Sequence, residues 1–197
     1  MKWSFIPKCI DYDGSQLASH FAYTTASLVG DSIVAFIGAC NVHFKWMVDV
    51  ADLSDNCEII SPHMLHFIAE YFDNDLNACI LRQRVLVSIL QQEINLRLKK
   101  QGSDRIVQRS GDDLFVGNKK LTISVATTSP VSCLIHLGVN ISVEGVPVEA
   151  IGLSELIPRK KVEVLAASVM KYCIAEEDSI REARALVRGV DEYRAGD

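Results

Sequence analysis

The residues best suited to chemistry lie on a predicted hairpin between positions 112 and 124. Its loop, Gly117-Asn118, is a two-residue turn of the kind that matches the twist of antiparallel strands. This loop fixes the register and places Asp113 diagonally across from Lys120, within side-chain reach. A lysine held by a carboxylate can neutralise a substrate carboxylate, or an oxyanion that forms during acyl transfer. We therefore assign Lys120 and Asp113 as the candidate catalytic pair.

Other polar residues alternate with apolar ones near this pair. In the next predicted strand Ile135, Leu137, Val139 and Ile141 alternate with polar or small residues, as expected when one face of a strand is buried. We expect the polar faces of this strand and of the hairpin to align around a glycine, which often marks the close approach of a ligand. The candidate ligand-binding residues are Arg109, Asp112, Ser124, His136, Gly138, Asn140 and, from a polar N-terminal segment, His20.

Each of these residues also has a structural interpretation. Lys120 and Asp113 can form an ordinary surface ion pair on the wet face of a sheet. His136 can be a hydrogen-bonded structural histidine, and His20 a helix cap. Two further candidates have less support: Cys40 as a reactive thiol and the pair His63 and His66 as metal ligands. Because no further ligands cluster with this pair, we expect no metal site.

Composition limits the class of protein. The chain has 197 residues, 49% of them hydrophobic, and a formal net charge of −5, which argues against general binding to nucleic acid. We expect a single domain over residues 1–197. No run of 18 apolar residues occurs, so we expect no membrane span. The first eight residues lack the apolar run of a signal peptide, and we expect a cytoplasmic protein whose six cysteines remain thiols.

Hydrophobic periodicity predicts the elements that hold these residues. Two long helices are expected, at 76–100 and 161–188, and a third at 62–72 because Ser61-Pro62 is typical of a helix start. A helical turn is expected at 151–157, and residues 16–28 fit either a helix or an ordered loop. The predicted strands are 3–10, 32–38, 39–44, 104–109, 112–116, 119–127 and 133–143. The fold class is α+β, with a mainly antiparallel or mixed sheet and helices packed on one side.

The stretch from 76 to 141 resembles the catalytic domain of the biotin and lipoate protein ligases. The residues that carry the likeness are Asp112-Asp113-Leu114-Phe115-Val116, Lys119-Lys120-Leu121-Thr122-Ile123-Ser124 and Leu137-Gly138-Val139-Asn140-Ile141. The resemblance implies that Lys120 takes the place of the lysine that binds the substrate carboxylate and the acyl-adenylate. It also implies that Asp113 and Asn140 take the places of the family's conserved acid and asparagine. No segment here matches the arginine- and glycine-rich phosphate loop of those ligases.

Residues 11–157 resemble more closely an uncharacterised family, domain-of-unknown-function family 366. Its pattern is present here as Asp11-Tyr12-Asp13-Gly14-Ser15, Ser19-His20-Phe21-Ala22-Tyr23, Gly30-Asp31-Ser32, Gly38-Ala39-Cys40-Asn41-Val42, Met47-Val48-Asp49, Arg109-Ser110-Gly111-Asp112-Asp113, Lys120-Leu121-Thr122-Ile123-Ser124, Ser129-Pro130-Val131-Ser132 and Ala150-Ile151-Gly152-Leu153. This likeness implies a fold of the ligase type.

The functional hypothesis is a ligase-like domain that binds a small carboxylate or acyl-nucleotide ligand. It leaves open whether the chain is an enzyme, with acyl transfer or ligation as the reaction and ATP or an acyl-nucleotide as the cofactor. The alternative is a non-catalytic small-molecule-binding or assembly module on the same fold. A third reading is an acyltransferase that uses a pre-activated acyl group without ATP. We expect a small-molecule ligand, no nucleic-acid or membrane partner, and leave a homo-oligomer open.

Overall fold

A five-stranded sheet forms the centre of the molecule, and the computed structural model describes residues 1–54, 59–145 and 149–190. The strands, in order across the sheet, are β1 (Lys2–Phe5), β2 (Ser32–Val42), β3 (Ile59–Tyr71), β8 (Cys133–Ser142) and β7 (Thr122–Thr128). β1 runs parallel to β2, and the other neighbouring pairs are antiparallel. The expected α+β class with a mixed, mainly antiparallel sheet is confirmed.

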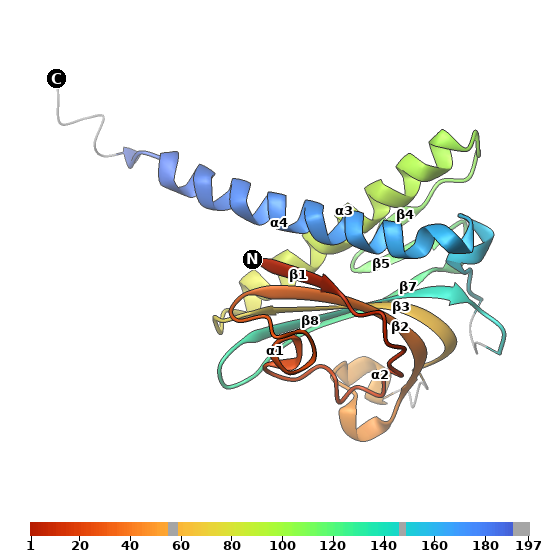
Figure 1. Ribbon diagram of the computed structural model, residues 1–197, viewed down its shortest axis with the longest axis horizontal. Helices are drawn as coiled ribbons and strands as arrows, with labels where there is room; N and C mark the ends of the chain where they lie inside the picture. Colours follow the sequence, from red (N-terminus) through yellow and green to blue (C-terminus); the bar gives the residue numbers. More distant parts are fainter. Residues whose placement is uncertain (55–58, 146–148, 191–197) are drawn as a thin grey trace.

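Two long helices, α3 (Leu76–Lys100) and α4 (Val162–Leu186), cover one face of this sheet (Figure 1). α3 starts where the carboxylate of Asp75 accepts a hydrogen bond from the Ala78 amide, at 3.0 Å. It ends among basic residues, which suit the negative end of the helix dipole. Both long helices were predicted from sequence, with boundaries within two residues of those observed.

A small second sheet lies beside α3 and β7. Its strands, in order, are β4 (Gln108–Ser110), β5 (Asp113–Val116) and β6 (Lys119–Lys120). The predicted strand 104–109 is thus shorter and later than expected, and the predicted strand 119–127 is divided into β6 and β7. The predicted turn at 151–157 is present as the 3-10 helix η2 (Leu153–Glu155), and a second one, η3 (Arg159–Lys161), leads into α4.

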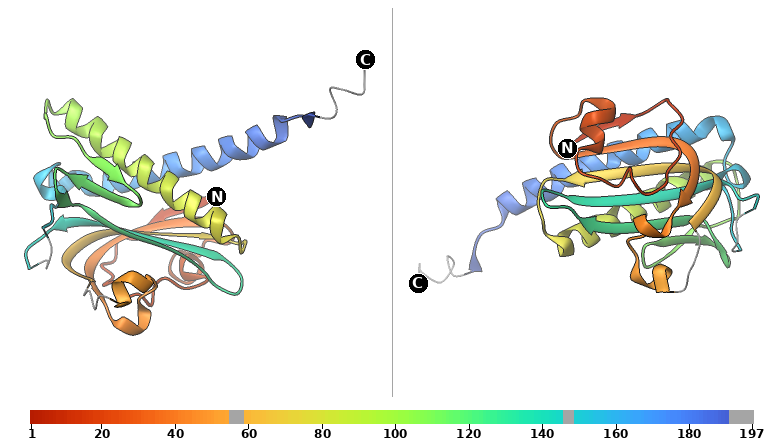
Figure 2. Two further views of the ribbon diagram at one scale, coloured as in Figure 1. Left: turned by 180° about the vertical axis from the view of Figure 1, so that it is seen from behind. Right: turned by 90° about the horizontal axis from the view of Figure 1, so that it is seen from below.

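The N-terminal segment covers the opposite face of the large sheet, together with the short elements α1 (Phe21–Ala26), η1 (Phe44–Trp46) and α2 (Val50–Ser54) (Figure 2). After β1 the segment continues along β2, where the Ile10 and Tyr12 amides bond to the carbonyls of Ile37 and Ala39. At Gly38 the two backbones nearly touch, because a Cβ there would lie far inside contact distance of the Ile10 carbonyl oxygen. Only glycine allows this crossing.

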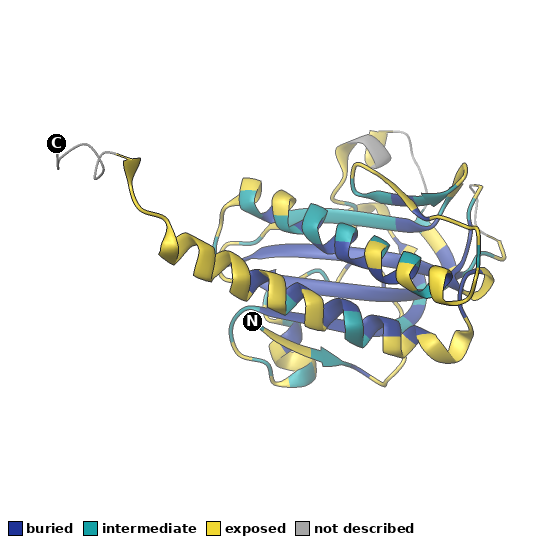
Figure 3. Ribbon diagram, turned by 90° about the horizontal axis from the view of Figure 1, so that it is seen from above, coloured by how far each residue is buried: buried dark blue, intermediate teal, exposed yellow. Residues whose placement is uncertain are grey.

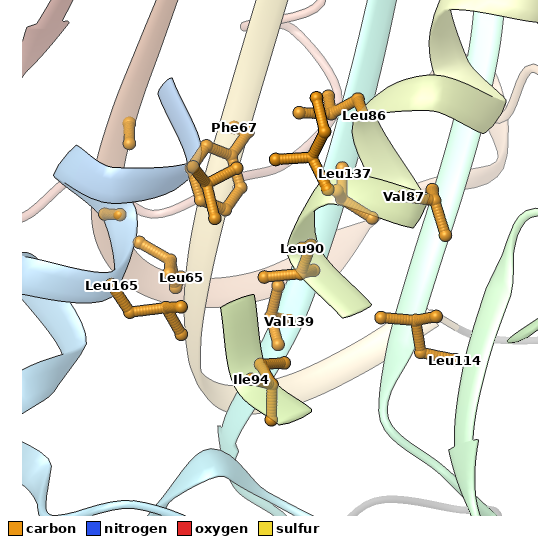
Figure 4. Close-up of a cluster of buried hydrophobic side chains, with 14 of the residues drawn as sticks. Leu65, Phe67, Leu86, Val87, Leu90, Ile94, Leu114, Leu137, Val139 and Leu165 are labelled. Atoms are coloured by element: carbon orange, nitrogen blue, oxygen red, sulfur yellow. The ribbon is translucent and has the colours of Figure 1, made fainter. Parts of the chain in front are cut away.

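The main core lies between the sheet and the two long helices (Figure 4). Leu90 of α3 is fully buried there, and Val139 of β8 and Phe67 of β3 belong to the same cluster. A second cluster, which contains Tyr12, Phe36 and Met64, lies under the N-terminal segment. The large sheet is therefore packed on both faces.

The predicted helix at 62–72 is wrong, because these residues belong to strand β3, whose far end is Tyr71. Ser61-Pro62 lies where the pairing of β2 and β3 shifts register, which is a place where a strand tolerates proline. From Met64 onward β3 is buried on both faces, and its continuous apolar run does not show the alternation of a half-exposed strand. The predicted strands 32–38 and 39–44 are likewise a single strand, β2.

Of the six cysteines, five lie among the described residues and all five are free thiols: Cys9, which is exposed, and Cys40, Cys79, Cys133 and Cys173, which are buried. Cys57 lies outside the described residues. In the part of the chain that the structure describes, no helix combines the length and the apolar character needed to cross a bilayer.

The core predicts a large difference between two leucines of α3. Leu90→Ala should lower the free energy of unfolding by about 2–5 kcal/mol, because it leaves a cavity against the sheet. Leu81→Ala, at a side chain 67% exposed, should change it by less than about 1 kcal/mol. Urea unfolding of both variants measures these values, and equal losses would contradict the packing described.

Candidate functional site

The predicted lysine–aspartate pair is present at the junction of the two sheets. Phe115 pairs with Lys120 and Val116 with Lys119, which is the register expected from the two-residue loop. The Lys120 ammonium lies 2.8 Å from a carboxylate oxygen of Asp113. The two side chains are 36% and 24% exposed, so the pair remains accessible from solvent.

Lys120 and Asp113 point away from the layer of helices. Their neighbours Leu114 and Leu121 are fully buried in the main core, and adjacent side chains of a strand point to opposite sides. Asn140 also points away from the helices, because Val139 and Ile141 on either side of it lie in that core. The backbone N–H of Asn140 donates a hydrogen bond of 3.0 Å to the backbone carbonyl of Leu121, the residue after Lys120.

The Asn140 side chain is oriented by β3. Its oxygen Oδ1 accepts a hydrogen bond from the Ser61 hydroxyl at 3.1 Å, and both residues are buried. With Oδ1 occupied in this way, the Asn140 side chain retains Nδ2 as a hydrogen-bond donor. Lys120, Asp113 and Asn140 together form the part of the candidate site that we call the Lys120 edge.

Farther along the same face, His136 and His66 form a buried pair. The distance between His66 Nδ1 and His136 Nε2 is 3.1 Å, and His66 Nε2 lies 3.4 Å from the Gly38 carbonyl oxygen. The ring of Tyr12 stacks on His136 with centroids 3.8 Å apart, and the ring of Phe36 stacks on His66 at 5.0 Å. The aromatic stack therefore joins the N-terminal segment to β2, β3 and β8.

These contacts fix where the protons of the histidine pair reside. The Gly38 carbonyl can only accept, so His66 Nε2 carries a proton, and neutral His66 then accepts at Nδ1 from His136 Nε2–H. Burial lowers the pKa of His66 to about 4, and burial together with the neighbouring His66 lowers the pKa of His136 well below its usual value. Both rings are therefore neutral near pH 7.

The glycine floor expected at Gly138 is filled by the protein itself. A Cβ at this position would lie 2.9 Å from the Met64 methyl, 3.0 Å from an Ile123 carbon and 3.3 Å from His136 Cε1. Gly138 thus marks the close approach of side chains, and with His136 2% exposed the two residues form a packed layer. The expectation that they line an open surface is wrong.

Ser124 and Asp112 lie on the helix side of the sheet, which corrects the expectation of one aligned polar face. Gln83 of α3 donates hydrogen bonds to both, at 2.8 Å to the Ser124 hydroxyl and 3.0 Å to the Asp112 carboxylate. Asp112 also pairs with Arg84 at 2.7 Å. For Ser124 the cause is a break in strand alternation at Leu121: β6 ends before this residue and β7 begins after it, with Ser124 opposite Leu137.

Arg109 and His20 are not brought to the Lys120 edge. Arg109 pairs with Leu114 instead of lying beside Asp113, and its guanidinium donates to the Gly111 carbonyl. The His20 amide donates to the buried carboxylate of Glu70 at 2.9 and 3.0 Å. Glu70 pairs with the β8 residue six positions before Asn140, about 20 Å along the strand. His20 therefore lies at the far end of the sheet, where it occupies the N-cap position of α1 without a side-chain capping hydrogen bond.

The weaker alternatives receive little support. Burial raises the pKa of the Cys40 thiol to about 12, which disfavours the reactive thiolate. His63 and His66 lie in a strand and not at a helix start. Among the described residues no group of three or more His, Cys, Asp or Glu side chains is arranged to hold a metal.

Sequence reasoning missed Tyr12, Ser61 and Gln83 as partners of the candidate residues, and it placed His66 on the wrong type of element. One signal was available: Tyr12 lies in the turn-rich segment Asp11-Tyr12-Asp13-Gly14, where a large aromatic residue among turn residues suggests an anchor. The Gln83 contacts had no local signal, because they join positions 29 and 41 residues apart.

Comparison with known proteins places the chain in a family. The model of the domain of unknown function DUF366 matches residues 1–188. The chain belongs to the DUF366 family. An uncharacterised protein of Methanocaldococcus jannaschii is 35% identical over 161 residues, which cover 77% of this chain and 69% of that protein.

Solved structures show the same fold. A protein of unknown function from Pyrococcus horikoshi is 38% identical and superposes with a TM-score of 0.83, over 95% of this DUF366 chain and 99% of that one. A mutant biotin protein ligase from Aquifex aeolicus, in complex with biotin, matches with a TM-score of 0.55 at 14% identity, over 92% and 72% of the two chains. The ligase-like fold expected from the sequence is therefore confirmed.

The buried histidine pair predicts how stability depends on pH. Below about pH 6.5 the unfolded histidines bind protons, whereas folded His66 stays neutral until about pH 4. The unfolded state thus binds more protons in this window, and stability falls as the pH is lowered, by about 2 kcal/mol from His66 between pH 7 and pH 5. Urea unfolding across this range measures the slope.

Two histidine variants separate this effect from general acid sensitivity. His66→Gln should flatten the pH dependence, whereas His43→Gln, at an exposed histidine, should leave the slope as in the natural chain. A free energy of unfolding that stays constant between pH 7 and pH 5 would contradict the neutral buried pair.

Proposed function

We propose that the Lys120 edge binds the anionic group of a small carboxylate or acyl-nucleotide ligand. The observation that carries the proposal is the partly exposed ion pair between Lys120 and Asp113, at 2.8 Å. Asp113 holds the lysine in one position. Because the Lys120 side chain is partly exposed, its ammonium group can also donate hydrogen bonds to a second anion. The global charge of −5 repels anions, so a local cation is needed for such a ligand to bind.

Asn140 supports this assignment from the neighbouring strand. Its Nδ2 group adds a neutral donor on the same side of the sheet as Lys120, held in place by Ser61. A cation and a preorganised amide donor are the groups that recognise a carboxylate and stabilise an oxyanion that develops from it. In acyl transfer or ligation, Lys120 would contact the acyl group or acyl phosphate, and Asp113 would orient Lys120.

The fold gives a reason to begin with carboxylic acids. The Aquifex ligase of the same fold is in complex with biotin, which is a small carboxylic acid. At 14% identity this likeness concerns the fold, so the ligand class for the DUF366 chain remains part of the proposal. ATP or an acyl-nucleotide is the cofactor class that the proposal includes.

A second candidate function is a binding module without catalysis on the same edge. The observation that favours it is the packing of Tyr12 on His136, and of Met64 near Gly138, which leaves fewer polar groups open on the sheet. ATP-dependent release of pyrophosphate distinguishes the two functions. Release with at least one member of a panel of carboxylic acids supports ligation, and none with any member supports the binding module.

The proposal predicts a loss of ligand binding in one lysine variant. Thermal unfolding is measured with a panel of short, branched and cyclic carboxylic acids and of adenine nucleotides. The natural chain should gain several degrees with at least one compound, because a ligand that binds only the folded state stabilises it. Lys120→Ala should lose most of that gain, because it removes the cation that faces the anion.

Lys119→Ala provides the matched control. Lys119 is the adjacent lysine on the same strand, it is exposed, and it pairs with Val116 on the opposite side of the hairpin. This variant should keep the full gain. Equal gains in both variants would refute the assignment of Lys120, and a panel without any effect would refute the ligand class.

A further inference from the structure

Two of the buried cysteines, Cys79 and Cys133, meet where the start of α3 lies over the sheet. Cys79 is in the first turn of α3, Cys133 is the first residue of β8, and both side chains are fully buried. They belong to the main core beneath the helical layer, where α3 is buried toward the sheet and exposed on its outer side (Figure 3). Neither cysteine belongs to the Lys120 edge.

Each sulfur atom lies against the backbone next to the other cysteine. Cys79 Sγ is 3.6 Å from the carbonyl oxygen of Leu134, the residue after Cys133. Cys133 Sγ is 3.4 Å from the carbonyl oxygen of Asp75, and the same oxygen accepts the backbone N–H of Cys79 at 2.9 Å. This reciprocal arrangement brings the two thiols into direct interaction with each other.

One side chain separates this pair of thiols from solvent. Cys133 Sγ lies 3.3 Å from a carboxylate oxygen of Asp73, whose side chain is 41% exposed. Arg82 of α3 holds the same carboxylate at 2.8 Å. A small oxidant therefore has to pass only one layer of side chains to reach the two sulfur atoms.

The two thiols differ in their charged surroundings. Burial, together with the Asp73 carboxylate, raises the pKa of Cys133 to about 12. Burial also raises the pKa of Cys79, but the Cys133 thiol and the Arg82 guanidinium act in the opposite direction. The positive end of the α3 dipole favours a thiolate in the first turn as well. Cys79 is therefore the thiol that ionises more readily, and Cys133 the one that keeps its proton.

We propose that Cys79 and Cys133 form an oxidisable dithiol, which hydrogen peroxide converts to a disulfide between α3 and β8. The Cys79 thiolate attacks one oxygen, the O–O bond breaks, and Cys79 becomes a sulfenic acid. The other oxygen leaves as hydroxide and takes up the proton that Cys79 released.

The second step closes the disulfide. The Cys133 sulfur attacks the Cys79 sulfur, the S–O bond breaks, and the hydroxide that leaves takes the proton of Cys133. The Asp73 carboxylate, which accepts the Cys133 S–H, is in position to pass on this proton. Two thiols and one hydrogen peroxide thus give one disulfide and two water molecules.

Other buried cysteines have different neighbours. Cys40 lies in the second core cluster, under the N-terminal segment, and Cys173 lies on α4, where its thiol contacts Tyr71. Oxidation should therefore join Cys79 to Cys133 and leave these two cysteines as thiols. The cross-link ties the start of α3 to the sheet, and it stabilises the protein because it restricts the unfolded chain.

Mapping of the thiols in the natural chain tests the disulfide. The protein is treated with a small excess of hydrogen peroxide, denatured with a maleimide present, and cleaved without reductant after acidic residues, which separates Cys57 from Cys79. Mass spectrometry should find peptides joined through Cys79 and Cys133, with the maleimide on Cys40 and Cys173. Maleimide on both members of the pair, or a disulfide from either to a different cysteine, would overturn the proposal.

Two single variants test the order of the steps. Cys133→Ser should accumulate the sulfenic acid at Cys79, which the cyclic diketone dimedone labels, because the thiol that resolves it is missing. Cys79→Ser should give little label at Cys133, since that thiol keeps its proton. The reverse pattern of labelling would contradict the roles assigned to the two cysteines.

Thermal unfolding measures the effect of the cross-link independently. The oxidised natural chain should unfold several degrees above the reduced chain, and dithiothreitol should remove the difference. Cys9→Ser, which replaces an exposed cysteine outside the pair, should show the same rise and the same joined peptides. Equal unfolding temperatures before and after oxidation would contradict a covalent tie between α3 and the sheet.

Discussion

The large sheet is covered on both faces, and its polar side chains must therefore find partners inside the protein. On the strand β8, Ile135, Leu137 and Val139 fill the core beneath the helices, so the residues between them are forced toward the N-terminal segment. That layer is also buried, with His136 2% and Asn140 6% exposed. The hydrogen bond between His66 and His136 and the one between Ser61 and Asn140 satisfy this requirement, and they join β3 to β8.

The same constraint determines where a ligand can bind. Over the middle of the sheet, Tyr12 and Met64 fill the space above His136 and Gly138, and the close crossing at Gly38 keeps the N-terminal segment in place. At the junction with the small sheet this cover is incomplete, and Lys120 and Asp113 keep part of their surface in solvent. The proposed polar site therefore lies at this junction, where the Lys120–Asp113 pair keeps contact with solvent.

The sequence was informative where a local pattern and the final environment agree. The periodicity of α3 and the Gly117-Asn118 loop specified a helix and a register that the structure contains. It misled at β3, where Ser61-Pro62 indicated the start of a helix and burial on both faces hides the alternation of a strand. The position of Ser124 could not be predicted, because the break in alternation at Leu121 arises from pairing with β8 and with Leu114.

The Lys120 edge is proposed to hold an anionic small molecule. The most direct measurement is mass spectrometry of the small molecules that remain bound to the protein purified without denaturation, from the natural chain and from Lys120→Ala in parallel. A carboxylic acid or acyl-nucleotide should be recovered with the natural chain, and its yield should drop at least tenfold with the variant. Recovery of no such compound, or of equal amounts from both proteins, would contradict it.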